Sequence, residues 1–288
     1  MKKEVVNKFE IKLEFNKDTE EPSRLFRSFA DLIDSIKELD TTLAKTINSN
    51  ISSKIYLDDI EKGSLIGKLW NHLVINENNK IDDNNIAEET ISEFIEESRS
   101  KSIEFIESGK SEVIDLEKLA KNIDELAEEK GIKETFNYAE PNILDLAKNL
   151  NDINEAVSKL SDDERFIIKD SKNKTEEISK GTEKINLEDV EKALTTEEIK
   201  SQSIVFYKIK RPDFLGDSQW DFKHGNKSLK VKILHEEWLE DFKQGKVIVV
   251  PGDSLKVKIK QSFKYNKHGY LISEKTEIIE VLEIKRNK

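Results

Sequence analysis

Residues 8–15 alternate strictly between charged and apolar side chains, and this pattern constrains the fold more than any other in the chain. Successive residues of a β-strand point to opposite faces, so a period of two places every apolar side chain on one face. The pattern therefore predicts a half-buried strand with one face on a core and the other in water. The inward residues are Phe9, Ile11, Leu13 and Phe15.

A long amphipathic helix is predicted directly after this strand. Pro22 is typical of the first turn of a helix, and apolar side chains then recur at steps of three and four from Leu25 to Ile47. Such a stripe needs an apolar partner, and the neighbouring sheet is the obvious one.

Two strand-like runs follow, at residues 54–60 and 64–74. Gly63 lies between them and can adopt the positive φ that a tight hairpin turn requires. Residues 1–76 are thus predicted to form a β-α-β-β module.

The middle region, residues 77–200, is acidic and predicted to be helical. The Asn-rich stretch at 76–85 is typical of a loop, and helical periodicity covers residues 86–108, 115–129 and 142–160. A polar stretch with few apolar residues predicts a mobile linker near 170–184, before a short helix at 187–194.

The last region, residues 201–288, has short alternating runs bounded by turn residues, which predicts a small β-barrel or sandwich. Residues 235–244 form the one helix expected in it. The fold class is therefore α+β. The alternating sets are Val205, Tyr207 and Ile209; Leu229, Val231 and Ile233; and Leu255, Val257 and Ile259.

Charge is divided unevenly along the chain. The net charge is −11, yet residues 201–288 hold 18 Lys and Arg against 12 Asp and Glu, a net charge of +6. A basic segment on an acidic chain suggests contact between that segment and a polyanion.

The composition also suggests where the protein resides. There is no cysteine, which excludes disulfides and thiolate chemistry and is consistent with a reducing compartment. No secretory pattern follows Lys2 and Lys3, and no apolar run reaches the roughly 20 residues that span a bilayer. We therefore expect a cytoplasmic bacterial protein that does not enter a membrane.

The strongest candidate site is a set of lysines on the predicted C-terminal strands. Alternation places them on the solvent face, where ammonium groups can follow phosphates while Phe263 or Tyr265 stacks on bases. The alternative is an ordinary solvated face whose charge is cancelled by glutamates on the last strand. The candidate residues are Lys230, Lys232, Lys256, Lys258 and Lys260.

Three aromatic residues stand out in the same region: Trp220, Phe222 and Trp238. Each is either an anchor at an interface with a partner or part of the barrel core. Burial in the core is the interpretation that we favour.

Metal-dependent hydrolysis is a weaker hypothesis. Acid-x-Lys triplets resemble nuclease sites; the candidates are the triplet beginning at Glu283 and Asp213 followed by the triplet beginning at Asp221. About eight such triplets are expected by chance in a chain so rich in acids and lysines. The four histidines are dispersed, and no nucleotide-binding loop or nucleophile elbow is present. We expect no catalytic residue, cofactor or metal ligand.

The order of these regions resembles bacterial families of no established activity that are often carried on mobile elements. The resemblance rests on the run from Gly63 to Leu65, the helical middle, Trp220 with Phe222, and the Pro-Gly-Asp turn at 251–253. It covers most of the chain and implies no activity and no site residue.

Three alternative hypotheses for the function remain open. The first is a non-catalytic interaction component of an intracellular bacterial system, of the phage-defence or mobile-element kind, with a protein partner. The second is nucleic-acid binding through the basic C-terminal region. The third is a metal-dependent hydrolase or nuclease.

Overall fold

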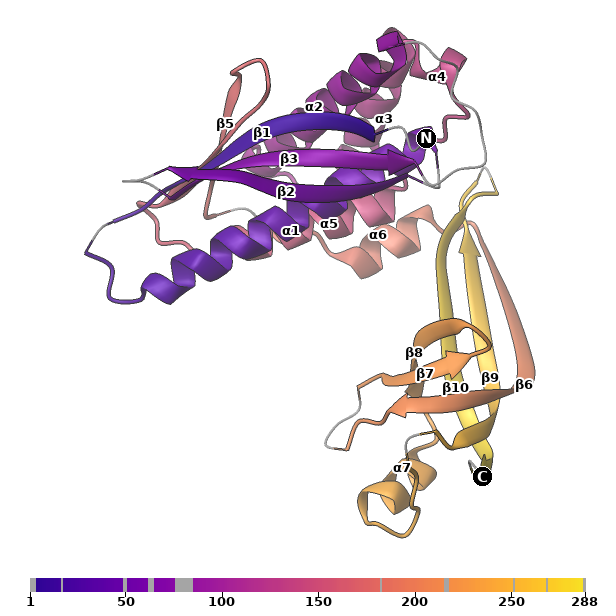
Figure 1. The fold of residues 1–288 in the computed structure, drawn as a ribbon. Helices are drawn as coiled ribbons and strands as arrows, with labels where there is room; N and C mark the ends of the chain where they lie inside the picture. The colour runs from indigo at the N-terminus through magenta and orange to yellow at the C-terminus, as the bar shows by residue number, and fades with distance from the viewer. Residues whose placement is uncertain are drawn as a thin grey trace. The chain divides into compact units, whose positions relative to one another are not determined.

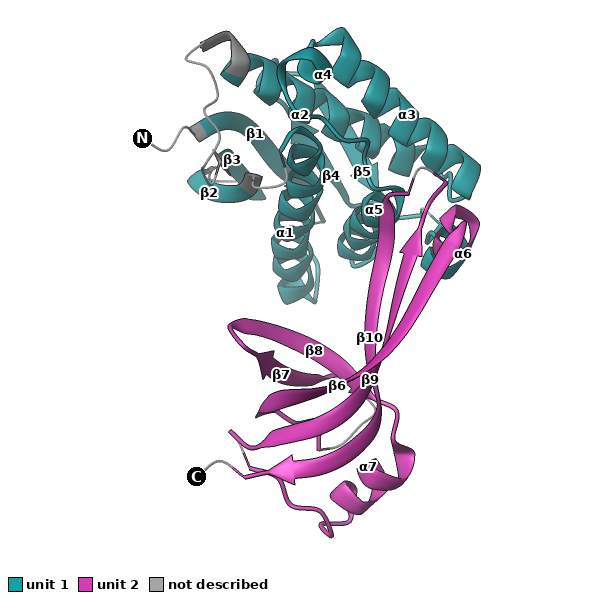
Figure 2. Ribbon diagram, turned by 90° about the vertical axis from the view of Figure 1, so that its right-hand side faces the viewer, with its two compact units in different colours: residues 1–190 teal, residues 191–288 magenta. Residues whose placement is uncertain are grey.

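The computed structural model describes residues 4–16, 18–48, 51–61, 65–75, 85–181, 183–214, 218–250, 252–267 and 269–286. The chain divides into two compact units, residues 1–190 and 191–288 (Figure 2). The predicted boundary between residues 76 and 77 falls inside the first unit, and the second unit begins at Glu191 rather than at residue 201.

The first unit is built on an antiparallel sheet of five strands in the order β2-β3-β1-β4-β5 (Figure 1). The predicted alternation is confirmed, because Phe9, Ile11 and Leu13 are buried while Lys8 on the other face is exposed. The strands are β1 (Glu4–Glu14), β2 (Ile51–Glu61), β3 (Leu65–Ile75), β4 (Arg165–Lys169) and β5 (Thr175–Ser179).

Among the described residues, five helices accompany this sheet along the chain, and a further helix, α6, crosses the boundary between the two units. The predicted β-α-β-β start is confirmed. The apolar stripe of α1 is buried from Leu25 to Ile47, as the spacing of three and four predicts. The helices are α1 (Pro22–Ile47), α2 (Asn85–Glu107), α3 (Val113–Glu129), α4 (Ile132–Thr135), α5 (Ile143–Val157) and α6 (Leu187–Leu194).

The linker predicted near residues 170–184 is wrong for residues 175–179, which form β5 at the edge of the sheet. β5 pairs along its whole length with β4, which in turn pairs with β1. Its inward face holds Ile178, which is fully buried, and Glu176, which accepts a hydrogen bond from Ser100 on α2. A strand with a single core residue shows no alternation in sequence, so polarity alone suggested a linker.

Some predicted features lie outside the described residues. They are the Gly63 turn with Ser64, the predicted loop up to residue 84, and Pro251 of the Pro-Gly-Asp turn.

A buried polar network joins α1 and α2 to the sheet. Arg99 on α2 forms hydrogen bonds of 2.8 and 2.9 Å with both oxygens of Asp40 on α1, and a third of 2.9 Å with Asn7 on β1. Asn71 on β3 also donates to Asp40, and Asn7 donates to Glu96 at 2.6 Å. Buried charges need such partners, so the network specifies how the helices sit on the sheet.

The second unit is a closed barrel of five strands, so the predicted small C-terminal barrel is confirmed. Neighbouring strands follow the order β10-β8-β7-β6-β9; the β10–β8 pair is parallel and the other pairs are antiparallel. The strands are β6 (Glu197–Arg211), β7 (Trp220–His224), β8 (Lys227–Ile233), β9 (Ser254–Tyr265) and β10 (Leu271–Lys285).

The barrel core is aromatic at one end. Trp220 and Phe222 on β7 are 1% and 0% exposed, and α7 (Glu236–Lys243), which connects β8 to β9, places Phe242 with its ring centre 4.8 Å from that of Trp220. Trp238 stacks on Phe242 at 5.9 Å. The predicted helix therefore packs on the barrel through its apolar face.

Candidate nucleic-acid interface

Three of the candidate lysines lie on the outward face of β9, because they alternate with core residues that are at most 2% exposed. Each stands directly across from a glutamate on β10, and opposite charges at such positions attract one another. In the described part of the chain, no ion pair within 4.0 Å involves these lysines, yet their charge is balanced along the strand. The facing pairs are Lys256–Glu283, Lys258–Glu280 and Lys260–Glu277.

The other two candidates, Lys230 and Lys232, are exposed on β8, which does not pair with β9. β10 lies between these strands, and its Glu277 stands across from Lys232 on one side and from Lys260 on the other. The five predicted lysines therefore do not form one continuous basic stripe. The glutamates on the last strand separate them, as the alternative interpretation anticipated.

The barrel has a different, uninterrupted basic feature, which we call the basic row. It runs around the outward face of all five strands through residues that are register partners, and none of its members is acidic. Its three lysines are exposed, and two of them, Lys208 and Lys223, face each other directly across β6 and β7. The row consists of Lys285, Ser254, Lys208, Lys223 and Ser228.

The sequence contained part of this information. Lys208 lies between Tyr207 and Ile209, and Lys223 follows Phe222, so alternation already indicates that both lysines point outward. Their convergence depends on which strands pair and in which register, and neither property can be read from alternation.

An exposed aromatic ring borders the basic row. Phe206 on β6 is 47% exposed, and its ring centre lies 5.7 Å from the Lys285 ammonium and 6.0 Å from that of Lys256. A ring between two cations is suited to stack on a base whose phosphates contact the lysines. The residues predicted for stacking, Phe263 and Tyr265, alternate onto the opposite face of β9 from Lys256, so that prediction is wrong.

The three candidate interface aromatics differ in burial. Trp220 and Phe222 are core residues, so their interpretation as interface anchors is wrong and the core interpretation holds. Trp238 is half-buried, with one ring face against Phe242.

The carboxylates considered for hydrolysis have other partners or face a lysine. Glu283 is on β10 opposite Lys256, Asp221 on β7 pairs with Arg211 at 2.9 Å, and Asp213 accepts from Ser218. Across the described ranges, no group of three or more His, Asp or Glu side chains is placed to hold a metal ion.

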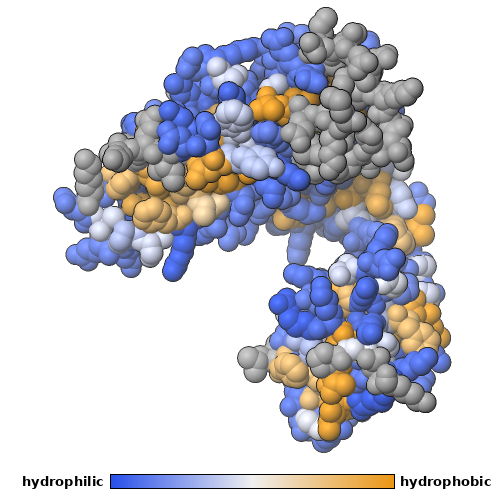
Figure 3. All heavy atoms as spheres, viewed as in Figure 1, coloured by the Kyte–Doolittle hydropathy of each residue, from blue (hydrophilic) through white to orange (hydrophobic). Residues whose placement is uncertain are grey.

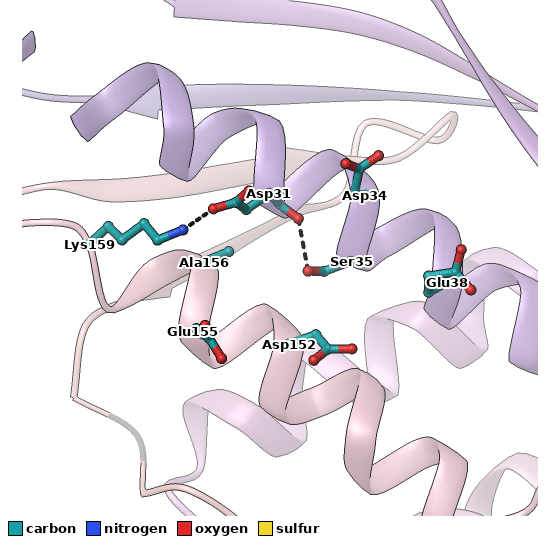
Figure 4. A pocket seen from close by; sticks show the side chains of 8 residues that line it. All are labelled: Asp31, Asp34, Ser35, Glu38, Asp152, Glu155, Ala156 and Lys159. Carbon is teal, nitrogen blue, oxygen red and sulfur yellow. Dashed lines mark hydrogen bonds and ion pairs between the residues drawn. The ribbon is translucent and has the colours of Figure 1, made fainter. Parts of the chain in front are cut away.

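An acidic groove of about 420 Å³ lies between α1 and α5 in the first unit (Figure 4). Burial raises the pKa of Asp152 there, and the nearby carboxylates Glu155 and Glu38 raise it further. Lys159 pairs with Asp31 at one side of the groove. The remaining carboxylates give the groove a negative charge that repels phosphate, so it is no part of a nucleic-acid interface.

In comparisons with protein-family models, curated proteins and solved structures, no match to this chain was found. Among the described residues, every helix is too short or too polar to cross a membrane.

Proposed function

We propose that this protein binds single-stranded nucleic acid through the outward face of its C-terminal barrel. The observation that carries the proposal is the basic row, in which three exposed lysines on β10, β6 and β7 are accompanied by two serines and no carboxylate. Lysines arranged in this way neutralise successive phosphates, while serine hydroxyls donate hydrogen bonds to phosphate oxygens.

The direct opposition of Lys208 and Lys223 supports an anionic ligand. Like charges at facing positions of two strands repel each other and destabilise the pair. A phosphate bound between them would turn this repulsion into attraction. The β9 lysines, in contrast, already face glutamates and need no external anion.

The topology of the barrel supports the same ligand class. Around the barrel the strands follow the order β6-β7-β8-β10-β9, and β9 pairs again with β6. In chain order these are the first, second, third, fifth and fourth strands, and α7 connects the third strand to the fourth. This is the arrangement of the oligonucleotide/oligosaccharide-binding fold, which binds its ligands across the second and third strands. Those strands are β7 and β8 here, and they contribute Lys223 and Ser228 to the basic row.

We propose binding rather than catalysis, because Asp221 and Asp213 are bound by Arg211 and Ser218, and Glu283 faces Lys256. The involvement of a protein partner in an intracellular bacterial system is compatible with this role.

The test is the anisotropy of a labelled oligothymidine of about 16 nucleotides, the upper end of the range that one such barrel covers, titrated at several salt concentrations. The variant Lys208→Glu with Lys223→Glu should bind at least about tenfold more weakly, and its log–log salt slope should fall by about 1.4, because two phosphate contacts are lost.

The matched control is Lys118→Glu with Lys148→Glu, which changes the net charge equally at exposed helical positions of the first unit. It should bind like the unmodified protein. Unchanged affinity and slope in the Lys208 and Lys223 variant, with its circular dichroism intact, would overturn the proposal, as would no binding by the unmodified protein at low salt.

A further inference from the structure

The first unit presents one face of its sheet to solvent. Helices pack on the other face, where Phe9 and Leu73 are buried, while Val6 and Lys8 on the opposite side of β1 are exposed (Figure 1). Apolar side chains reach the surface over these strands in the space-filling view (Figure 3). We call this surface the open face.

Three aromatic rings gather on the open face of β2 and β3. Tyr56 is 52% exposed and lies directly across from Trp70. The His72 ring is stacked near-parallel to that of Trp70, with an angle of 14° and centres 6.2 Å apart, and meets Tyr56 edge to face at 4.7 Å. Trp70 and His72 are half-buried. Large rings are ordinarily buried, so a cluster of rings that reaches solvent indicates a binding surface.

Lysines flank the rings, and neither of the two register rows that contain the rings includes a carboxylate. The Lys8 ammonium on β1 lies 4.1 Å from the centre of the Trp70 ring, and Lys54 on β2 stands across from His72. Two adjacent rows across the sheet therefore hold three rings, two lysines and Val6. The rows are Tyr56–Trp70–Lys8 and Lys54–His72–Val6.

A hollow of about 210 Å³ adjoins Trp70 and Lys8. It is smaller than the roughly 300–1,000 Å³ typical of pockets for drug-sized ligands, so it suits a single planar ring. Three carboxylates and three lysines line it: Glu10, Asp58, Asp170, Lys8, Lys68 and Lys169. The carboxylates accept hydrogen bonds from the exocyclic amino groups of bases, and the lysines donate to their ring nitrogens and carbonyl oxygens, so the lining suits the edge of a base.

From this geometry we infer that the open face is a second nucleic-acid contact site, where Trp70 and Tyr56 stack on unpaired bases and Lys8 and Lys54 contact the adjoining phosphates. Every base has an aromatic face, so a platform of this kind binds single strands with little sequence preference. The site uses none of the barrel residues, although its ligand class is the one proposed for the barrel.

The experiment compares the full chain with the variant Tyr56→Ala with Trp70→Ala in the same oligonucleotide titration. Loss of two stacking rings should weaken binding at least about tenfold and leave the salt slope unchanged, because stacking releases no counterions. The control is Phe26→Ala, which removes a ring that is 62% exposed on α1 of the same unit and should change nothing.

A second readout does not depend on the stability of the alanine variant. Of the three tryptophans, Trp70 is the one in the site, so the fluorescence difference between the unmodified protein and Trp70→Phe isolates its signal. Oligothymidine should quench this difference signal, and Trp70→Phe should keep most of the affinity.

The two sites can be told apart by their failures. If the alanine variant binds normally and the Trp70 signal is not quenched, the open-face inference is overturned, for example because the rings serve a protein partner. If the Lys208→Glu with Lys223→Glu variant binds the oligonucleotide normally while the Tyr56→Ala with Trp70→Ala variant binds it weakly, the barrel proposal fails and the open-face inference is supported.

Discussion

Arg99 on α2 donates two hydrogen bonds, of 2.8 and 2.9 Å, to Asp40 on α1, and the two side chains are 3% and 0% exposed. The Arg99 guanidinium also lies 4.5 Å from the centre of the Phe9 ring on β1. Burial raises the pKa of Asp40 and the charge of Arg99 opposes that rise. The pair thus joins two helices to the strand beneath them.

The first prediction concerns this pair. Asp40→Ala should lower the free energy of unfolding of the first unit by about 3–5 kcal/mol, because it leaves the Arg99 charge buried with too few partners. Replacing both residues, as in Asp40→Leu with Arg99→Met, should cost far less. Urea unfolding followed by Trp70 fluorescence measures the free energy of unfolding of both variants. An equal decrease in the two variants would contradict the explanation that an unpaired buried charge causes the loss.

The second prediction concerns pH. The Arg24 guanidinium, bound at 2.6 and 3.0 Å, lowers the pKa of Glu164, whose side chain is 1% exposed. A carboxyl with a lowered folded-state pKa stabilises the protein above its unfolded value of about 4.3 and loses that contribution as pH falls through the folded value. The stability difference between the unmodified protein and Glu164→Gln should therefore shrink below about pH 4.3. A pH-independent difference in urea midpoints would exclude this mechanism.

The third prediction concerns the barrel core. Trp220→Ala or Phe222→Ala should destabilise the second unit by about 3–5 kcal/mol, since each leaves a cavity that the strands cannot close. Phe214→Ala, at a position that is 63% exposed, is the control and should cost under about 1 kcal/mol. Thermal unfolding monitored by near-ultraviolet circular dichroism gives the comparison.

The fourth prediction concerns the ring beside the basic row. Phe206→Ala should weaken oligothymidine binding about five- to tenfold without altering the salt slope, because it removes stacking and no charge. Ile204→Ala, at a position 57% exposed two residues earlier on the same face of β6, should leave binding unchanged. An equal loss in both variants would indicate general disturbance of β6.

Much of the fold was predictable because the spacing of apolar residues along a long amphipathic strand or helix shows which of the two it is. The strand containing Phe9 and Ile11, the α1 stripe and the three alternating sets of the barrel bury most of the residues that the pattern indicated, and Val205 and Leu229 are partly buried. The five-residue strands β4 and β5 were missed, since Phe166, Ile168 and Ile178 are too few to establish a period.

The candidate site was predictable only in part. Lysines on barrel strands were expected to face outward, but Lys208, Lys223 and Lys285 converge only through the pairing of β6 with β7 and of β9 with its two neighbours. The Tyr56–Trp70 cluster depends in the same way on the register of β2 against β3. Alternation reveals the direction of a side chain, whereas its neighbours depend on contacts distant in sequence.

Closure of the barrel has a consequence for how ligand preference can change. Where the five strands close into a ring, no free edge is left on which a peptide could add a further strand, so recognition there depends on outward side chains. These alternate with an interior that is already filled, so substitutions at positions 206, 208 or 223 are free to retune affinity or ligand choice while the scaffold persists. Such a surface can diversify rapidly without a loss of foldability.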